Sequence, residues 1–163
     1  RKDSAVAALR KSVADALLGF KDKGLTVEQR NGKVYVSLEE RLLFASGSTE
    51  VDKKGAEAIR QLAKVLDKNT DINVLIEGHT DNVPISTPTI KDNWDLSTMR
   101  ATAIVRIITN NSKMDAKRLT AAGRSQYLPI DAANTPEARK KNRRTEIILT
   151  PKLDELFKVL ENN

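Results

Sequence analysis

The stretch from residue 72 to residue 109 constrains the fold more than any other part of the chain. Residues 72–76, Ile-Asn-Val-Leu-Ile, form a short apolar run that predicts a buried strand, and Gly78 marks its end. A helix is predicted at about 95–109 from apolar spacing. Its apolar positions are Leu96, Met99, Ala103 and Ile107. A buried strand that leads through a loop into a helix is typical of an α/β domain, in which ligands bind beyond the carboxyl ends of the strands.

Two charged side chains flank this junction. Asp81 follows the strand, and Arg100 lies in the early turns of the helix, with Asp95 or Ser97 available as the N-cap. A carboxylate and a guanidinium at this edge of a sheet suit a zwitterion, which carries both an ammonium and a carboxylate. Asp81 and Arg100 could instead pair with each other, and the spacing alone favours that simpler interpretation.

The rest of the chain predicts a mixed sheet. Asn31-Gly32 joins two alternating stretches, 25–30 and 33–38, into a hairpin. Further strands are expected at the end of 116–123 and at 145–149. Two more helices are expected, at about 52–67 with Thr49 and Asp52 as a capping box and at 136–142 with Thr135 as the cap before Pro136. The predicted fold class is α/β, a mixed β-sheet with helices packed on one face in β-α-β-α-β order, plus an N-terminal and a C-terminal helix.

The two ends of the chain fall outside this central block. Residues 1–24 predict a helical stripe, which either docks on the domain or is the end of a coiled coil or linker. Residues 25–150 are expected to form the main domain, and residues 151–163 a C-terminal helix. The long loop at 82–92 is expected to be a functional lid or an insertion.

Composition excludes several classes of protein. The 163 residues contain no cysteine, which rules out disulfides and thiolate metal sites, and no apolar run approaches the roughly 20 residues of a membrane helix. The net charge is +6, with a basic cluster at 139–144 that fits any polyanionic surface. Aromatic residues make up only 4%, which offers few platforms for stacking bases, so we expect no nucleic-acid partner. Because the chain starts at Arg1 and not at methionine, we expect a processed or truncated fragment of a longer protein, whose export signal or membrane attachment would lie upstream of Arg1.

Several separated motifs share one order with a known family. They are Gly78-His79-Thr80-Asp81, Asn93-x-x-Leu96-Ser97-x-x-Arg100-Ala101, Gly123, and Asn142-Arg143-Arg144-x-Glu146-Ile147. Together they resemble the OmpA-like peptidoglycan-binding domain, which the peptidoglycan-associated lipoprotein and the flagellar stator protein MotB share. The resemblance runs over roughly residues 34–150. The sequence Asn82-Val83-Pro84 and the longer loop that follows depart from many members and are closer to the stator version.

The resemblance implies a binding module without catalytic residues, metal or cofactor. Its ligand would be peptidoglycan, held non-covalently through the diaminopimelate of the stem peptide, and the module would anchor an envelope protein to the cell wall. The expected location is the periplasmic side of the outer membrane in a Gram-negative cell envelope, with a homodimer left open. The residues implied in ligand binding are Asp81, Arg100, Asn93, Thr80, Arg143 and Arg144.

Alternatives to this function remain at the level of sequence. An enzyme acting on the cell wall is one, although no nucleophile with a base and no paired carboxylates for glycoside hydrolysis are evident. A polyanion-binding or nucleic-acid-binding domain is another. His79 and Asp81 have the spacing of metal ligands on a strand, but a lone histidine is more often a hydrogen-bonded structural residue. Trp94 is expected to anchor the loop, with a sugar-stacking platform as the alternative.

Overall fold

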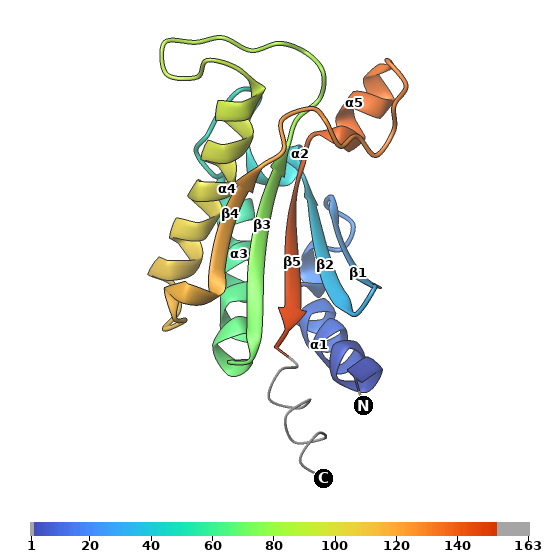
Figure 1. Cartoon of the computed structure of the whole chain (residues 1–163), viewed down its shortest axis with the longest axis vertical. Helices are drawn as coiled ribbons and strands as arrows, with labels where there is room; N and C mark the ends of the chain where they lie inside the picture. The colour runs from blue at the N-terminus through green and yellow to red at the C-terminus, as the bar shows by residue number, and fades with distance from the viewer. Residues whose placement is uncertain (1, 153–163) are drawn as a thin grey trace.

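The computed structural model describes residues 2–152 and shows a five-stranded sheet with helices on one face (Figure 1). The strands are β1 (Leu25–Arg30), β2 (Lys33–Glu39), β3 (Ile72–His79), β4 (Leu119–Gly123) and β5 (Arg144–Pro151). The helices are α1 (Lys2–Ala16), α2 (Glu40–Leu43), α3 (Lys53–Lys68), α4 (Asn93–Asn110) and α5 (Pro136–Asn142), with short 3-10 turns η1 (Leu18–Phe20) and η2 (Ala116–Arg118).

The strand order in the sheet is β1-β2-β5-β3-β4. Strands β1 and β2 form the predicted hairpin, in which Asn31 and Gly32 both have positive φ, as a two-residue turn between antiparallel strands requires. The last strand, β5, inserts between β2 and β3 and is antiparallel to both, whereas β3 and β4 run parallel. The sheet is therefore mixed, as the sequence predicted.

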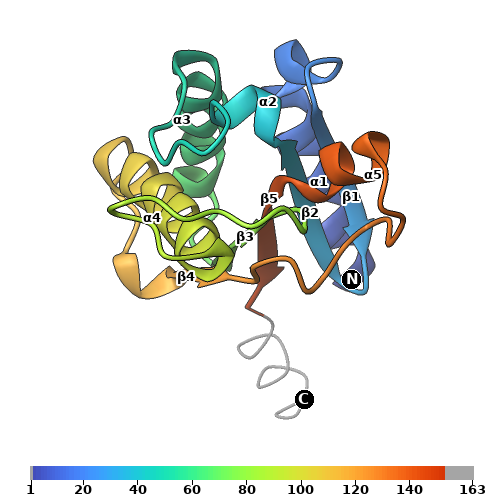
Figure 2. The same ribbon diagram turned by 90° about the horizontal axis from the view of Figure 1, so that it is seen from above.

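The hydrophobic core fills one face of the sheet. Strand β2 alternates buried and partly buried residues, so that Val34, Val36 and Leu38 point to the same side as Ile147 and Leu149 of β5. Helices α1, α3 and α4 cover this side, and Figure 2 shows α3 and α4 lying together on it. Ile59, Leu62 and Leu66 of α3 are all buried there. The predicted fold class, with helices on one face of a mixed sheet, is confirmed.

Helix α4 turns to the core a face that overlaps the predicted one only in part, since Leu96 is buried as predicted and Met99 is not. Its buried apolar residues are Leu96, Ala101, Ile104 and Ile108, whereas Met99 is 40% exposed and Ala103 and Ile107 are only partly buried. The apolar spacing was misleading because the buried face also carries Ser97 and Arg100, two polar residues that belong to the site described below. The cap was also predicted wrongly, since Asp92, and neither Asp95 nor Ser97, accepts the hydrogen bond of the first turn.

Of the two other predicted helix caps, one is wrong and one is confirmed. The Thr49 and Asp52 capping box is not formed, because Asp52 is the N-cap of α3 but makes no capping hydrogen bond through its side chain. At α5, Thr135 accepts a hydrogen bond from the backbone of Ala138 and Pro136 begins the helix, as predicted. Capping is local chemistry, and it was predictable only where the helix start was placed correctly.

Helix α1 docks on the domain, which was one of the two interpretations left open by the sequence. Val6 and Val13 are completely buried, and Leu9 and Leu17 nearly so, in the same core as β1, β2 and α3. At the other end, Pro151 still belongs to β5. The predicted C-terminal helix otherwise falls in residues 153–163, outside the described residues. Among residues 2–152 no helix is long and apolar enough to cross a bilayer.

Candidate functional site

A hollow of about 480 Å³ lies beyond the carboxyl end of β3, where the sequence placed the site. It is open between the segment 45–48, the loop after β3 and the start of α4. Most of the implied binding residues line it. The lining residues are Glu40, Ser46, Gly47, Thr80, Asp81, Val83, Pro84, Ile85, Asn93, Leu96, Arg100 and Arg143.

Asp81 reaches this hollow from the end of β3. One carboxylate oxygen accepts a hydrogen bond from the backbone of Val83 at 3.0 Å, which fixes the turn into the loop. The other oxygen accepts a hydrogen bond from Arg143 at 2.8 Å. Arg143 lies between α5 and β5, so this ion pair joins two segments that are 62 residues apart in the chain. Asp81 is only 9% exposed, so its negative charge is stabilised by these two hydrogen bonds more than by water.

The simpler interpretation of the sequence, in which Arg100 pairs with Asp81, is wrong. Arg100 has other partners. Its side chain is only 4% exposed and lies over the ring of Phe44. Its Nε donates to the carbonyl of Ser48 at 2.8 Å, and one terminal nitrogen donates to the carbonyl of Ala45. The other terminal nitrogen donates to Glu40 at 2.7 Å. Two of the five guanidinium N–H groups have no partner within residues 2–152.

Glu40 is the site residue that sequence reasoning missed. It begins α2, directly after β2, and its carboxylate lies between Arg100 at 2.7 Å and Arg143 at 3.2 Å. The backbone N–H of Glu40 also donates to the carbonyl of Arg143. Residues 39–48 have no clear hydrophobic period, so the sequence does not place this segment. It also gives no reason to choose Glu40 over its neighbour Glu39. Only the pairing of β2 with β5 brings Glu40 to the site.

Thr80 and Asn93 line the hollow but are largely used to hold its backbone. The hydroxyl of Thr80 donates to the carbonyl of Asp81 at 2.9 Å. The amide of Asn93 donates to the carbonyl of Val83 at 3.1 Å and to the side chain of Gln126 at 3.4 Å. Asn93 therefore ties the start of α4 to the loop that carries Asp81. Both side chains are nearly buried.

Arg144 is the one implied residue that the structure does not bring to the hollow. Arg143 is the C-cap of α5 and lines the hollow, whereas Arg144 begins β5 and does not. It donates to the carbonyls of Asn142 and Leu128 and lies 3.6 Å from Glu146. Burial lowers the pKa of its guanidinium. Its position makes it a support for the loop between β4 and α5.

Three residues near Arg144 have the chemistry of metal ligands. Glu77, His79 and Glu146 each offer an atom within 4.8 Å of the others on the open face of the sheet. Their carboxylates, however, already have cationic partners, since Arg124 lies 3.3 Å from Glu77. The hydrogen bond with His79 is the main reason why the pKa of Glu77 is lowered, against the effect of burial. The arrangement is that of a buried ion-pair network.

Trp94 and the loop before it sit beside the hollow. Trp94 is 49% exposed, and its ring packs at a tilt against Tyr127, with 5.4 Å between the ring centroids. In the loop, Ile90 is buried and exchanges hydrogen bonds with Thr87. This contact joins Trp94 to the loop after β4 and not to residues 82–92, so the predicted anchoring of that loop stays a prediction, and the exposed half of the indole leaves sugar stacking open.

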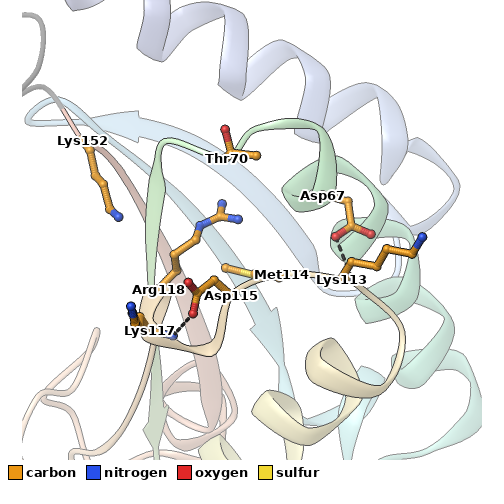
Figure 3. A pocket seen from close by; sticks show the side chains of 8 residues that line it. All are labelled: Asp67, Thr70, Lys113, Met114, Asp115, Lys117, Arg118 and Lys152. Carbon is orange, nitrogen blue, oxygen red and sulfur yellow. Dashed lines mark hydrogen bonds between the residues drawn. The ribbon is translucent and has the colours of Figure 1, made fainter.

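A second, larger hollow of about 670 Å³ lies at the opposite end of the sheet (Figure 3). It has several basic side chains, of which Arg118 is the most buried. The Arg118 guanidinium donates to the carbonyls of Leu66, Asn69 and Ile72 and so closes the carboxyl end of α3. Asp67 and Asp115 each accept a hydrogen bond from a backbone N–H of this region. Arg118, Asp67 and Asp115 therefore stabilise the fold here. We place the candidate site at the first hollow.

The fold and the charged hollow define the class of the protein. Residues 43–143 match the OmpA family, and the chain belongs to that family.

Similar proteins include both curated relatives and solved structures. Motility protein B of Bacillus subtilis is 34% identical over 117 residues, which is 72% of this chain and 45% of that protein. The chain thus spans about half the length of such relatives. The structure of the cell wall anchor of the T6SS from Pseudomonas aeruginosa has a TM-score of 0.78 and 33% identity over 85% of this chain and 96% of that one. A putative MotB-like protein from Desulfovibrio vulgaris shares the fold, with a TM-score of 0.78 and 24% identity over 92% of this chain and 98% of that one.

Proposed function

We propose that the hollow binds the diaminopimelate of a peptidoglycan stem peptide, and that the domain anchors an envelope protein to the cell wall without catalysis. The observation that carries this proposal is a row of alternating charges in one cavity. Asp81, Arg143, Glu40 and Arg100 follow one another with separations of 2.8, 3.2 and 2.7 Å. A ligand that carries an ammonium and a carboxylate on one carbon complements such a row.

Each end of the ligand has a partner in this arrangement. The ammonium binds the carboxylate of Asp81, which is nearly buried and faces the hollow. The carboxylate binds the N–H groups of Arg100 that are left over, together with Arg143, which is 32% exposed. Thr80 and Asn93 hold the loop that carries Asp81. Charge-assisted hydrogen bonds are worth roughly 1.5 to 3 kcal/mol each, which gives modest and reversible binding.

The relatives support this assignment. The Pseudomonas aeruginosa structure is that of a cell wall anchor, and this chain is similar both to it and to motility protein B. We propose accordingly that this chain works in the cell envelope, on the side that faces the wall, as part of a longer protein attached to a membrane. The outer-membrane location expected from the sequence remains part of this proposal, which leaves the homodimer open.

The experiment is a pull-down with purified sacculi that contain diaminopimelate. Asp81→Ala should lower the affinity by about 30-fold or more, because losing one partner of a desolvated charged contact costs about 2 to 5 kcal/mol. Asp71→Ala is the matched control, since Asp71 is an exposed aspartate at the other end of the same strand. If wild type and Asp81→Ala bind sacculi equally, the site is wrong.

The same material separates the alternative functions. Soluble fragments released from sacculi over time would show an enzyme acting on the wall. DNA binding that weakens steeply between two salt concentrations would show a polyanion-binding domain instead. The anchor proposal expects neither result.

A further inference from the structure

Glu40 gives the hollow a balanced charge. Of the twelve residues that line it, only Glu40, Asp81, Arg100 and Arg143 are charged, two of each sign. Without Glu40, two guanidinium groups would face a single carboxylate, and the cavity would carry a net positive charge. A site with excess positive charge binds simple anions, and many envelope components end in a carboxylate.

We propose that Glu40 is the residue that makes this pocket select a zwitterion over a plain carboxylate. The proposal rests on the proposed function, because it concerns the same ligand in the same cavity. Glu40 lies between both arginines, at 2.7 Å from Arg100 and 3.2 Å from Arg143, so its charge acts on both cationic groups. Its side chain is 15% exposed, which keeps water from screening that charge fully.

The geometry explains how this selection works. Each oxygen of Glu40 has one arginine partner, and a carboxylate oxygen can accept more than one hydrogen bond. Asp81 and Glu40 share Arg143 as a partner, so a ligand ammonium that binds Asp81 is also attracted by the charge of Glu40 on the other side of that guanidinium. A ligand without the ammonium adds a third negative charge to Glu40 and Asp81 and leaves nothing to balance it. Glu40 thus acts as a specificity-determining residue.

Glutamine and aspartate separate charge from shape at this position. Glu40→Gln keeps the length of the side chain and an oxygen that accepts from Arg100, but it removes the charge. Glu40→Asp keeps the charge and shortens the side chain by one methylene. A purely structural role would depend on the hydrogen bonds, whereas selection by charge balance depends on the negative charge.

The test measures the binding of two peptides by calorimetry. One is a stem peptide with free diaminopimelate, and the other is the same peptide with the free diaminopimelate amine acetylated, which leaves the carboxylate alone. Wild type should prefer the free peptide by about tenfold or more. Glu40→Gln should reduce this preference by about threefold or more, with part of the change coming from tighter binding of the acetylated peptide, and the preference that remains is the contribution of Asp81. Glu40→Asp should keep most of the preference.

The outcomes distinguish this inference from the proposed function. If wild type binds both peptides equally well, the selection does not exist, and this holds even if Glu40→Gln fails to fold. An equal loss of affinity for both peptides in Glu40→Gln would mean that Glu40 only positions the arginines, and the inference would fail while the site stands. No binding of either peptide by folded wild type would overturn the proposed function and this inference together.

Discussion

Arg100 holds the segment 45–48 against α4, so it should matter for stability as well as for binding. Arg100→Ala would leave the carbonyls of Ser48 and Ala45 without their donor and would remove one partner of Glu40. Unpaired buried groups of this kind cost about 1 to 3 kcal/mol each, and part of that cost is relieved by water that enters the space. We expect the free energy of unfolding to fall by about 3 kcal/mol in urea titrations.

Arg106→Ala is the control for this substitution, because Arg106 is an exposed arginine on the same helix. It should change the free energy of unfolding by less than about 0.5 kcal/mol. Equal stability of Arg100→Ala and wild type would show that the guanidinium is not an anchor of this segment. A ligand-binding assay on Arg100→Ala alone would therefore mix two effects.

Glu77 should make the stability of the protein depend on pH in the acid range. Its pKa is lowered in the folded state, first by the hydrogen bond with His79 and also by the charge of Arg124. This contribution to stability is complete above the unfolded pKa of about 4.3 and is lost as the pH falls through the lower folded value. Glu77→Gln should flatten the fall in thermal stability below about pH 5.

Glu50→Gln gives the matched substitution at an exposed glutamate, and the difference between the two variants isolates the buried network. The groups facing Glu77 are His79, Arg124, Glu146 and Arg144. A Glu77→Gln variant that loses stability toward low pH as steeply as the wild type would assign the acid sensitivity to other carboxylates.

The sequence could place several site residues but not their partners. The motifs around Asp81, Asn93 and Arg100 lie next to a strand end and a helix start, which are local signals, and the structure brings these residues to one hollow. Glu40 comes from a segment without a period and reaches the hollow only through long-range strand pairing. The basic run could not show that Arg143 faces the hollow while Arg144 faces away, because that depends on where β5 begins.

At the scale of elements, two glycines let α4 lie against the sheet. A side chain on Gly78 would overlap the carbonyl oxygen of Ser97, and one on Gly123 would overlap the side chain of Thr98. Neither residue has a positive φ, so close approach is the reason for glycine here. This close packing explains how β3 and α4 are held near enough to share one site.

Gly78→Ala should therefore push α4 away from β3. We expect a loss of about 2 kcal/mol or more in the free energy of unfolding, together with weaker binding of sacculi, because Asn93 and Arg100 would move with the helix. Gly19→Ala is the control, since a methyl group there meets no atom within 4 Å. Thermal unfolding and the pull-down on both variants test this, and an unchanged Gly78→Ala protein would contradict the packing.

The element types were predicted from periodicity, whereas the buried face of α4 was not. Periodicity assumes that buried means apolar, and this helix buries Ser97 and Arg100 because the segment 45–48 and the loop after β4 supply their partners. Those partners come from distant parts of the chain. Polar site residues on the buried face of a helix thus interrupt the apolar periodicity from which that face is predicted.

At the scale of the whole molecule, α1 belongs to the same core as the sheet. Val13→Asp places a charge at a completely buried position, and we expect it to lower the free energy of unfolding by at least about 3 kcal/mol. Ser12→Asp puts the same group on the exposed side of the helix and should have little effect. If urea unfolding shows no difference between them, α1 does not pack as described.

Binding should survive the loss of α1 packing as long as the sheet stays folded. None of the residues that line the hollow comes from residues 1–24. We therefore expect Val13→Asp, assayed well below its melting temperature, to match the wild type in its affinity for the stem peptide. A lost affinity in a folded variant would contradict this.

The start of α1 and the hollow lie at opposite ends of the sheet (Figure 1). A pull between the first turn of α1 and a ligand held by Asp81 and Arg143 would therefore run along the strands. The hydrogen bonds between antiparallel strands stand perpendicular to that direction, so the ladders of β2, β5 and β3 would be loaded in shear, with many bonds sharing the force at once. A pull across the sheet would instead open the same bonds one after another. How much of such a pull reaches these ladders is set by the side-chain packing that holds α1 on the core.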